Sequence, residues 1–289
     1  MQRRHFLVSA VLSLFAAQRV KGAATGKAQP GSAKLPVLFI GHGSPMNAIQ
    51  NNDFTRHLSQ LGKTLPRPRA ILMISAHWVT DGSRVSAHPK PATIHDFGGF
   101  PQTLFNMQYP SPGQPMLASQ VASLLGRMNI REDADRGLDH GTWTVLHHLY
   151  PKADIPVVQL SLNGHLSLRE HLELASGLKA LRTQGILIIG SGNVVHNLPL
   201  TDERSRAGPY DWAQEFDEHI KQALLQRDHG GLLAQDRRHH RLWRMAHPTL
   251  EHYLPLLYTV GAANQQEAVV FPYEGFQERS LSMRSVRIG

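Results

Sequence analysis

Short, continuous apolar runs are the feature that most limits the fold of this chain. They are rich in β-branched residues or bounded by proline and glycine, and they cover residues 35–40, 70–75, 155–162 and 186–189. Runs of this length without polar alternation are typical of strands buried on both faces. Apolar residues at steps of three and four predict helices over residues 115–128, 167–182 and 210–226. Together these patterns predict an α/β fold with a central, mostly parallel sheet and helices on both faces.

A single domain is expected over residues 35–289, because a chain of 289 residues can bury one large core. Residues 269–289 predict a terminal pair of strands around a turn at residues 272–276. No repeat of fixed period is visible.

The N-terminal stretch has the order of an export signal. Arg3 and Arg4 precede an apolar run over residues 6–17, and small residues follow. A run this short does not span a bilayer, which takes roughly 20 residues, so no stable membrane anchor is expected. We therefore predict a twin-arginine-type signal peptide over residues 1–24, read by the twin-arginine export machinery, a linker over residues 25–34, and a periplasmic location.

Composition excludes several classes of site. The chain has no cysteine, which excludes disulfides, thiolate metal sites and iron–sulfur clusters, so any metal is bound through nitrogen and oxygen. The formal net charge of +8 is dispersed rather than gathered in a basic stripe with aromatic residues. We therefore expect no nucleic-acid partner.

Histidines follow three of the predicted strands. His42 and His77 each come two residues after their runs, with His42 flanked by glycines, and residues 190–195 connect the last run to His196. One such histidine carries little weight in a chain with 18 of them. Three in the same position predict a metal site, because the carboxyl ends of parallel strands meet and imidazole is the commonest metal ligand.

Two competing interpretations of the glycine-rich turns are weaker. Residues 41–44 could form a phosphate loop, but the Walker pattern and its lysine are missing. Residues 190–192 enclose a serine between glycines, but the spacing of a hydrolase nucleophile elbow is not met.

Further candidates lie in the remaining loops. His140 precedes a predicted helix, where a loop could aim it into a site. Residues 94–101 combine an acid, glycines and aromatic residues, which suits either a loop over a planar ligand or a well-packed turn. Thr249 can cap a helix whose first turn contains Glu251, so we interpret Glu251 as a partner of the helix dipole, with Glu251 or His252 as a further metal ligand in the alternative.

Six motifs in order carry a family resemblance: GHGSPM at 41–46, SAHW at 75–78, IHDFGGFP at 94–101, LDHG at 138–141, SGNVVHNL at 191–198 and EHYLPL at 251–256. With them the chain closely resembles the bacterial 4,5-DOPA extradiol dioxygenases, within the class III extradiol (LigB-like) ring-cleaving enzymes. The resemblance covers residues 35–289 and implies a LigB-like α/β catalytic domain.

The resemblance also implies a metal centre. It assigns one divalent metal to His42, His77 and His252, with His196 on the metal or beside it. Wider relatives use two histidines and a glutamate, so His252 stands where their carboxylate stands. Fe(II) is the metal expected for oxygen chemistry, and Zn(II) is the alternative in isolated protein.

The implied reaction is the opening of a catechol such as DOPA by O₂ to a muconic semialdehyde, with both oxygen atoms incorporated. The expected partners are therefore a small aromatic diol and O₂. His196 and His140 are the expected acid/base groups, and His95 and Phe97 are expected to flank the substrate ring. The alternatives are a zinc-dependent hydrolase and a metal-binding protein without oxygenase activity, which would not consume O₂ with a catechol and Fe(II).

Overall fold

The computed structural model describes residues 34–205, 207–233 and 240–289. The predicted signal peptide and the linker up to residue 33 lie outside the described residues. Within the described part of the chain, no helix combines the length and the hydropathy that crossing a bilayer requires.

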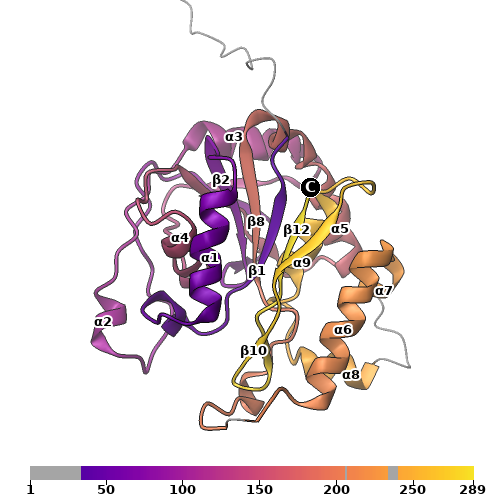
Figure 1. Ribbon diagram of the computed structural model, residues 1–289. Helices are drawn as coiled ribbons and strands as arrows, with labels where there is room; N and C mark the ends of the chain where they lie inside the picture. Colours follow the sequence, from indigo (N-terminus) through magenta and orange to yellow (C-terminus); the bar gives the residue numbers. More distant parts are fainter. Residues whose placement is uncertain (1–33, 206, 234–239) are drawn as a thin grey trace, which may run out of the picture. The chain divides into compact units, whose positions relative to one another are not determined.

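A six-stranded sheet forms the centre of the domain (Figure 1). Its strands, in spatial order, are β6 (Val157–Gln159), β2 (Ala70–Ser75), β8 (Ile186–Gly192), β1 (Val37–Gly41), β12 (Ser285–Ile288) and β9 (Val269–Tyr273). The first four run parallel to one another, and β12 runs antiparallel to both of its neighbours, β1 and β9. The predicted mostly parallel sheet is confirmed.

The sheet is covered on both faces, because alternate side chains of each strand enter two different apolar cores. Phe39 belongs to the core that contains helices α5 (Leu168–Ser176) and α9 (Leu254–Gly261). Its neighbour Leu38 belongs to the core formed with α1 (Asp53–Thr64) and α4 (His140–Leu149). Burial on both faces explains why β1 and most of β2 and β8 are apolar without polar alternation.

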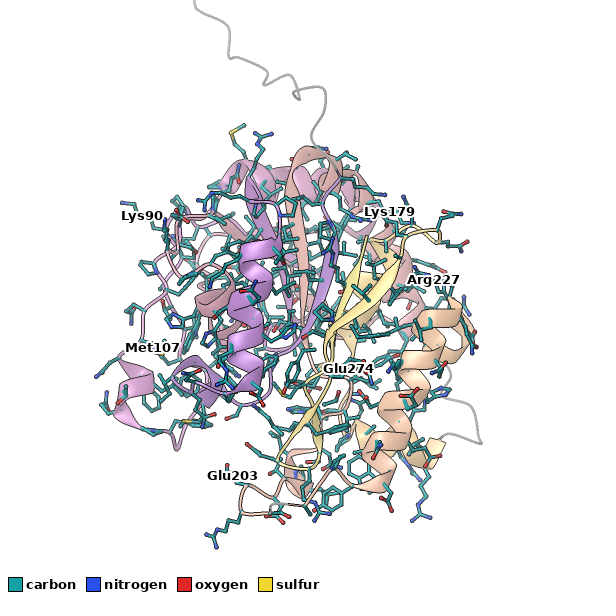
Figure 2. The ribbon with its side chains drawn as sticks, viewed as in Figure 1. Lys90, Met107, Lys179, Glu203, Arg227 and Glu274 are labelled. Atoms are coloured by element: carbon teal, nitrogen blue, oxygen red, sulfur yellow. The ribbon has the colours of Figure 1, made fainter. Side chains whose placement is uncertain are left out.

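The remaining elements surround the central sheet and its two apolar cores. They are α2 (Gln102–Phe105), α3 (Pro115–Leu124), α6 (Asp211–Gln226), α7 (His229–Leu233), α8 (His240–Ala246), β3 (Val79–Thr80), β4 (Arg84–Ser86), β5 (Arg131–Asp133), β7 (Leu162–Asn163), β10 (Phe276–Gln277) and β11 (Leu281–Ser282). The small β10–β11 hairpin extends from the end of the central sheet, and Glu203 lies near it (Figure 2).

The helix predictions were right in place but too long in two cases. Over residues 115–128 the α-helix ends at Leu124, and a 3-10 turn follows at Gly126–Met128. Over residues 167–182, α5 ends at Ser176 and a 3-10 turn occupies Lys179–Gln184. Glycines at the two ends interrupt the α-helical hydrogen bonding, since glycine is a poor helix former.

Two strand predictions need correction. The run over residues 155–162 is not one strand: β6 leaves the sheet after Gln159, and β7 pairs with β3 instead. The C-terminal strands do pair, but the chain reverses at residues 278–280, where Glu278 and Arg279 have φ of 49° and 64°. Pro272 lies within β9, which is tolerated because β9 is an edge strand.

The register of the three central strands brings their carboxyl ends level. Gly41 at the end of β1 pairs with Gly192 of β8, and Ser75 at the end of β2 pairs with Ser191. Segments that follow β1, β2 and β8 therefore emerge side by side at one edge of the sheet, which is where ligands collect in open α/β sheets.

Candidate metal centre

His42 and His77 meet at this edge. The His42 N–H donates to the Gly192 carbonyl at 2.9 Å, and the Ala76 N–H donates to the Ser191 carbonyl at 3.0 Å, so both segments are tied to β8 as they leave the sheet. The Nε2 atoms of His42 and His77 lie 3.1 Å apart. The sequence predicted this meeting from the strand ends alone.

His252 reaches the same place from the turn that precedes α9. Its carbonyl accepts a hydrogen bond from the Asn193 N–H at 2.8 Å. Its ring centroid lies 5.3 Å from that of His42 and 5.0 Å from that of His77. A Cβ on Gly192 would lie 2.1 Å from the His252 carbonyl oxygen, so this close approach requires glycine.

The outward ring nitrogens are held by protein groups. Ser191 Oγ donates its single proton to the Gly141 carbonyl at 2.6 Å, so it accepts at 2.9 Å from Nδ1–H of His42. Nδ1 of His252 lies 3.1 Å from Oε1 of Glu251, and its buried Nε2 has no hydrogen-bond partner among the described residues. The Nε2 lone pair of His42 is thereby left available, and the geometry leaves Nε2 of His252 available as well.

The three imidazoles suit a divalent cation. One nitrogen from each of His42, His77 and His252 lies within 4.8 Å of the others. Burial, reinforced by the neighbouring imidazoles, holds the pKa of His42 and His252 well below 6.5, and burial and His140 lower the pKa of His77 to about 4. The rings are neutral at pH 7, which is the form that binds metal.

His196 lies against His252 rather than beside all three ligand candidates. The two rings are stacked, with centroids 3.4 Å apart and planes 5° from parallel. The His196 N–H donates to the Ala246 carbonyl at 2.9 Å, which fixes the segment that follows β8. Burial and the neighbouring histidines lower the pKa of His196 to about 3, so its ring is neutral at pH 7.

His140 is the first residue of α4, not a loop residue. Asp139 caps this helix by accepting from the Thr142 N–H, and the His140 ring lies 3.8 Å from that of His77 between centroids. Asp96 stands next to both rings, with Oδ1 3.0 Å from Nδ1 of His140 and Oδ2 3.9 Å from Nδ1 of His77. Burial opposes ionisation of Asp96, but His140 lowers its pKa to about 2.

Phe97 and His95 lie at different distances from this cluster. The Phe97 ring is 5.5 Å from that of His140, so it borders the site. His95 packs behind Phe97 at 5.8 Å, and its Nε2 lies 3.0 Å from the Met107 carbonyl. The structure therefore places Phe97 beside the histidines and His95 one layer further out.

Three residues at the site were missed or misinterpreted in the sequence. Ser191 was considered only as a hydrolase nucleophile, and Asp96 only as part of a loop. The helix-dipole interpretation of Glu251 was wrong, because α9 begins at Leu254 with Tyr253 at its N-cap, beyond both Glu251 and Thr249. The available signal for Glu251 was its place directly next to a candidate ligand, His252.

The geometry is that of an α/β protein with a histidine cluster at the carboxyl edge of its sheet. The family described as the catalytic LigB subunit of aromatic ring-opening dioxygenases matches residues 36–285, and the chain belongs to this family. The family is metal-dependent, in agreement with the cluster.

The relatives agree with this assignment. A protein of Escherichia coli K12 named 4,5-DOPA dioxygenase extradiol is 46% identical over 263 residues, which are 89% of this chain and 96% of the relative. A Beta vulgaris protein of the same name is 39% identical over 234 residues, covering 79% of this chain and 87% of the relative. The crystal structure of an uncharacterized E. coli K12 protein matches with a TM-score of 0.77 and 42% identity over 88% of this chain and 100% of that one. The LigB-like fold and the family prediction are confirmed.

Proposed function

We propose that this member of the extradiol dioxygenase family opens the ring of a catechol such as DOPA, with O₂ and one divalent metal, to a muconic semialdehyde. The observation that carries the proposal is the convergence of three neutral imidazoles, two of them with Nδ1 engaged and Nε2 left available. The name shared by the E. coli and Beta vulgaris relatives supports DOPA as the substrate.

The metal would be held by His42, His77 and His252. When bound, Fe(II) supplies the centre at which the catechol and O₂ meet and exchange electrons. Zn(II) fits the same nitrogen ligands but has no redox chemistry, so it would occupy the site without supporting oxygen activation.

His196 is proposed as an acid/base group beside the metal rather than as a fourth ligand. The His196 ring is stacked on that of His252, with centroids 3.4 Å apart, so His196 would stand beside a ring that holds the metal. A neutral His196 can instead take a phenolic proton from the catechol onto a ring nitrogen.

His140 and Phe97 would contact the substrate as well. Asp96 faces Nδ1 of His140, which leaves Nε2 to hydrogen-bond the catechol or the oxygen. Phe97 would pack on the aromatic ring of the substrate. His95 would hold Phe97 in place, because the centroids of their two rings lie 5.8 Å apart. This arrangement would orient the ring and exclude water from it.

Oxygen uptake tests the proposal. The chain is purified without air, loaded with Fe(II) or Zn(II), and mixed with DOPA and simpler catechols while O₂ consumption and the yellow semialdehyde are followed. We expect activity with Fe(II) only, its loss in His42→Ala, and its retention in His165→Ala, which removes an exposed histidine paired with Asp81. No O₂ consumption with any catechol, despite stoichiometric bound metal, would refute the proposal and favour a zinc-dependent hydrolase or a metal-binding protein.

We also propose that the chain is exported by the twin-arginine machinery to the periplasm. The support is the sequence of residues 1–24, in which an arginine pair precedes a short apolar run. Replacing Arg3 and Arg4 by lysine should leave the protein in the cytoplasmic fraction of a cell that has this machinery. Unchanged fractionation would contradict the assignment.

A further inference from the structure

Glu251 contacts the candidate metal ligand His252 at Nδ1, the nitrogen that is not expected to bind the metal. Its Oε1 lies 3.1 Å from Nδ1 of His252 and also accepts a hydrogen bond from the Thr249 hydroxyl at 2.9 Å. The Glu251 side chain is 28% exposed, whereas that of His252 is 6% exposed. The carboxylate thus keeps access to solvent while it holds a buried ring.

The Nδ1 atoms of the three candidate ligands have different neighbours. His42 has a neutral hydroxyl, that of Ser191, at its Nδ1. For His77 the nearest carboxylate oxygen of Asp96 is 3.9 Å away, beyond hydrogen-bond distance, and Asp96 lies closer to His140. Among the residues that the structure describes, His252 is the only one of these three rings with a carboxylate within hydrogen-bond distance.

The charge of the site makes this contact significant. Three neutral imidazoles bring no negative charge to a divalent cation, whereas a set of two histidines and a carboxylate brings one. A carboxylate that accepts from the far N–H of a ligating histidine fixes its tautomer and makes the ligating nitrogen more basic. In this chain, Glu251 is placed to fix the tautomer of His252 and to make its ligating nitrogen more basic.

We propose that Glu251 is a positioning residue of the metal centre: it holds His252 with the proton on Nδ1 and Nε2 free for the metal, and it supplies from one residue away the negative charge that the three histidines lack. The inference rests on the metal site proposed above but not on the ring-opening reaction. Removing such a partner typically weakens metal binding about 10- to 100-fold.

Metal affinity and tautomer test the proposal together. The metal-free wild type, Glu251→Gln, Glu251→Ala and Glu132→Gln are titrated with Zn(II) against a competing chelator, and the ring nitrogens of His252 are assigned by ¹⁵N NMR. Glu132→Gln is the matched control, because Glu132 is an exposed glutamate on β5. Circular dichroism of the metal-free proteins reports whether each variant is folded.

We expect the Nδ1–H tautomer of His252 in the metal-free wild type, a 10- to 100-fold weaker Zn(II) affinity in both Glu251 variants, and wild-type affinity in Glu132→Gln. An Nε2–H tautomer in the wild type would overturn the proposal even if no variant folded. Affinity within twofold of the wild type in a folded Glu251→Gln and Glu251→Ala would overturn it as well. Because no readout uses a catechol, tight metal binding without ring cleavage would refute the proposed function and leave this inference standing.

Discussion

Gly192→Ala is expected to force apart the end of β8 and the segment that carries His252. The added Cβ would lie 2.1 Å from the His252 carbonyl oxygen, whereas ordinary contacts begin at 3.4 Å, so one segment must move by about 1.3 Å. Neither side yields easily, because Gly192 is the last residue of a buried strand and the obstructing atom belongs to the backbone.

The cost has two parts. Overpacking a buried site costs about 1–3 kcal/mol, and the hydrogen bond from Asn193 to the His252 carbonyl, worth about 1 kcal/mol, is stretched or lost. We therefore expect the free energy of unfolding of the metal-free protein to fall by about 2–4 kcal/mol. The Zn(II) affinity should fall too, because His252 is displaced from His42 and His77.

Urea unfolding followed by circular dichroism measures the first effect, and chelator competition measures the second. Gly126→Ala is the control, because a Cβ there meets nothing within 4 Å. It should change stability by no more than about 0.5 kcal/mol. A Gly192→Ala protein as stable as Gly126→Ala, with unchanged metal affinity, would refute the packing argument.

Three further changes probe the groups around the histidines and a buried histidine elsewhere. Ser191→Ala removes the acceptor for Nδ1–H of His42, so Zn(II) affinity in a chelator titration should fall about tenfold. Asp96→Asn should lower kcat in the oxygen-uptake assay more than it lowers metal affinity, because Asp96 contacts His140 more closely than His77; an equal loss of both would contradict this. Burial lowers the pKa of His171 to about 4 from its ordinary 6.5, so its contribution to stability is complete above pH 6.5 and declines toward pH 4 as the unfolded chain binds the proton first. The unfolding free energy of the metal-free wild type should therefore drop more steeply with falling pH than that of His171→Gln, by up to about 1.4 kcal/mol per pH unit; parallel slopes would rule this out.

The strands and the meeting of His42 with His77 were predictable because they depend on local patterns. A strand buried on both faces is apolar throughout, and the residue after a parallel strand lies at the carboxyl edge of the sheet. The order of the strands depends on long-range pairing, so the adjacency of β1, β8 and β2 was not available from the sequence. That the strands end at the same height follows only from the register of the structure, in which Gly41 pairs with Gly192.

The errors have local physical causes. The apolar run over residues 155–162 continues past the sheet because Leu160 and Leu162 are buried outside it, so hydropathy alone gives no end point. Glu251 was interpreted through a helix that starts later than Thr249 suggested, since Pro255 occupies the first turn of α9. The side-chain partners of His42 and His252 are tertiary details that motif order does not contain.

Labelled oxygen tests the central claim most directly. The Fe(II)-loaded chain is mixed with a catechol under ¹⁸O₂, the aldehyde is reduced at once to prevent exchange with water, and the product is analysed by mass spectrometry. We predict a ring-opened product that carries both labelled atoms, one in the new carboxylate and one in the former aldehyde. A ring-opened product without label, or an intact ring with O₂ consumed, would contradict the account.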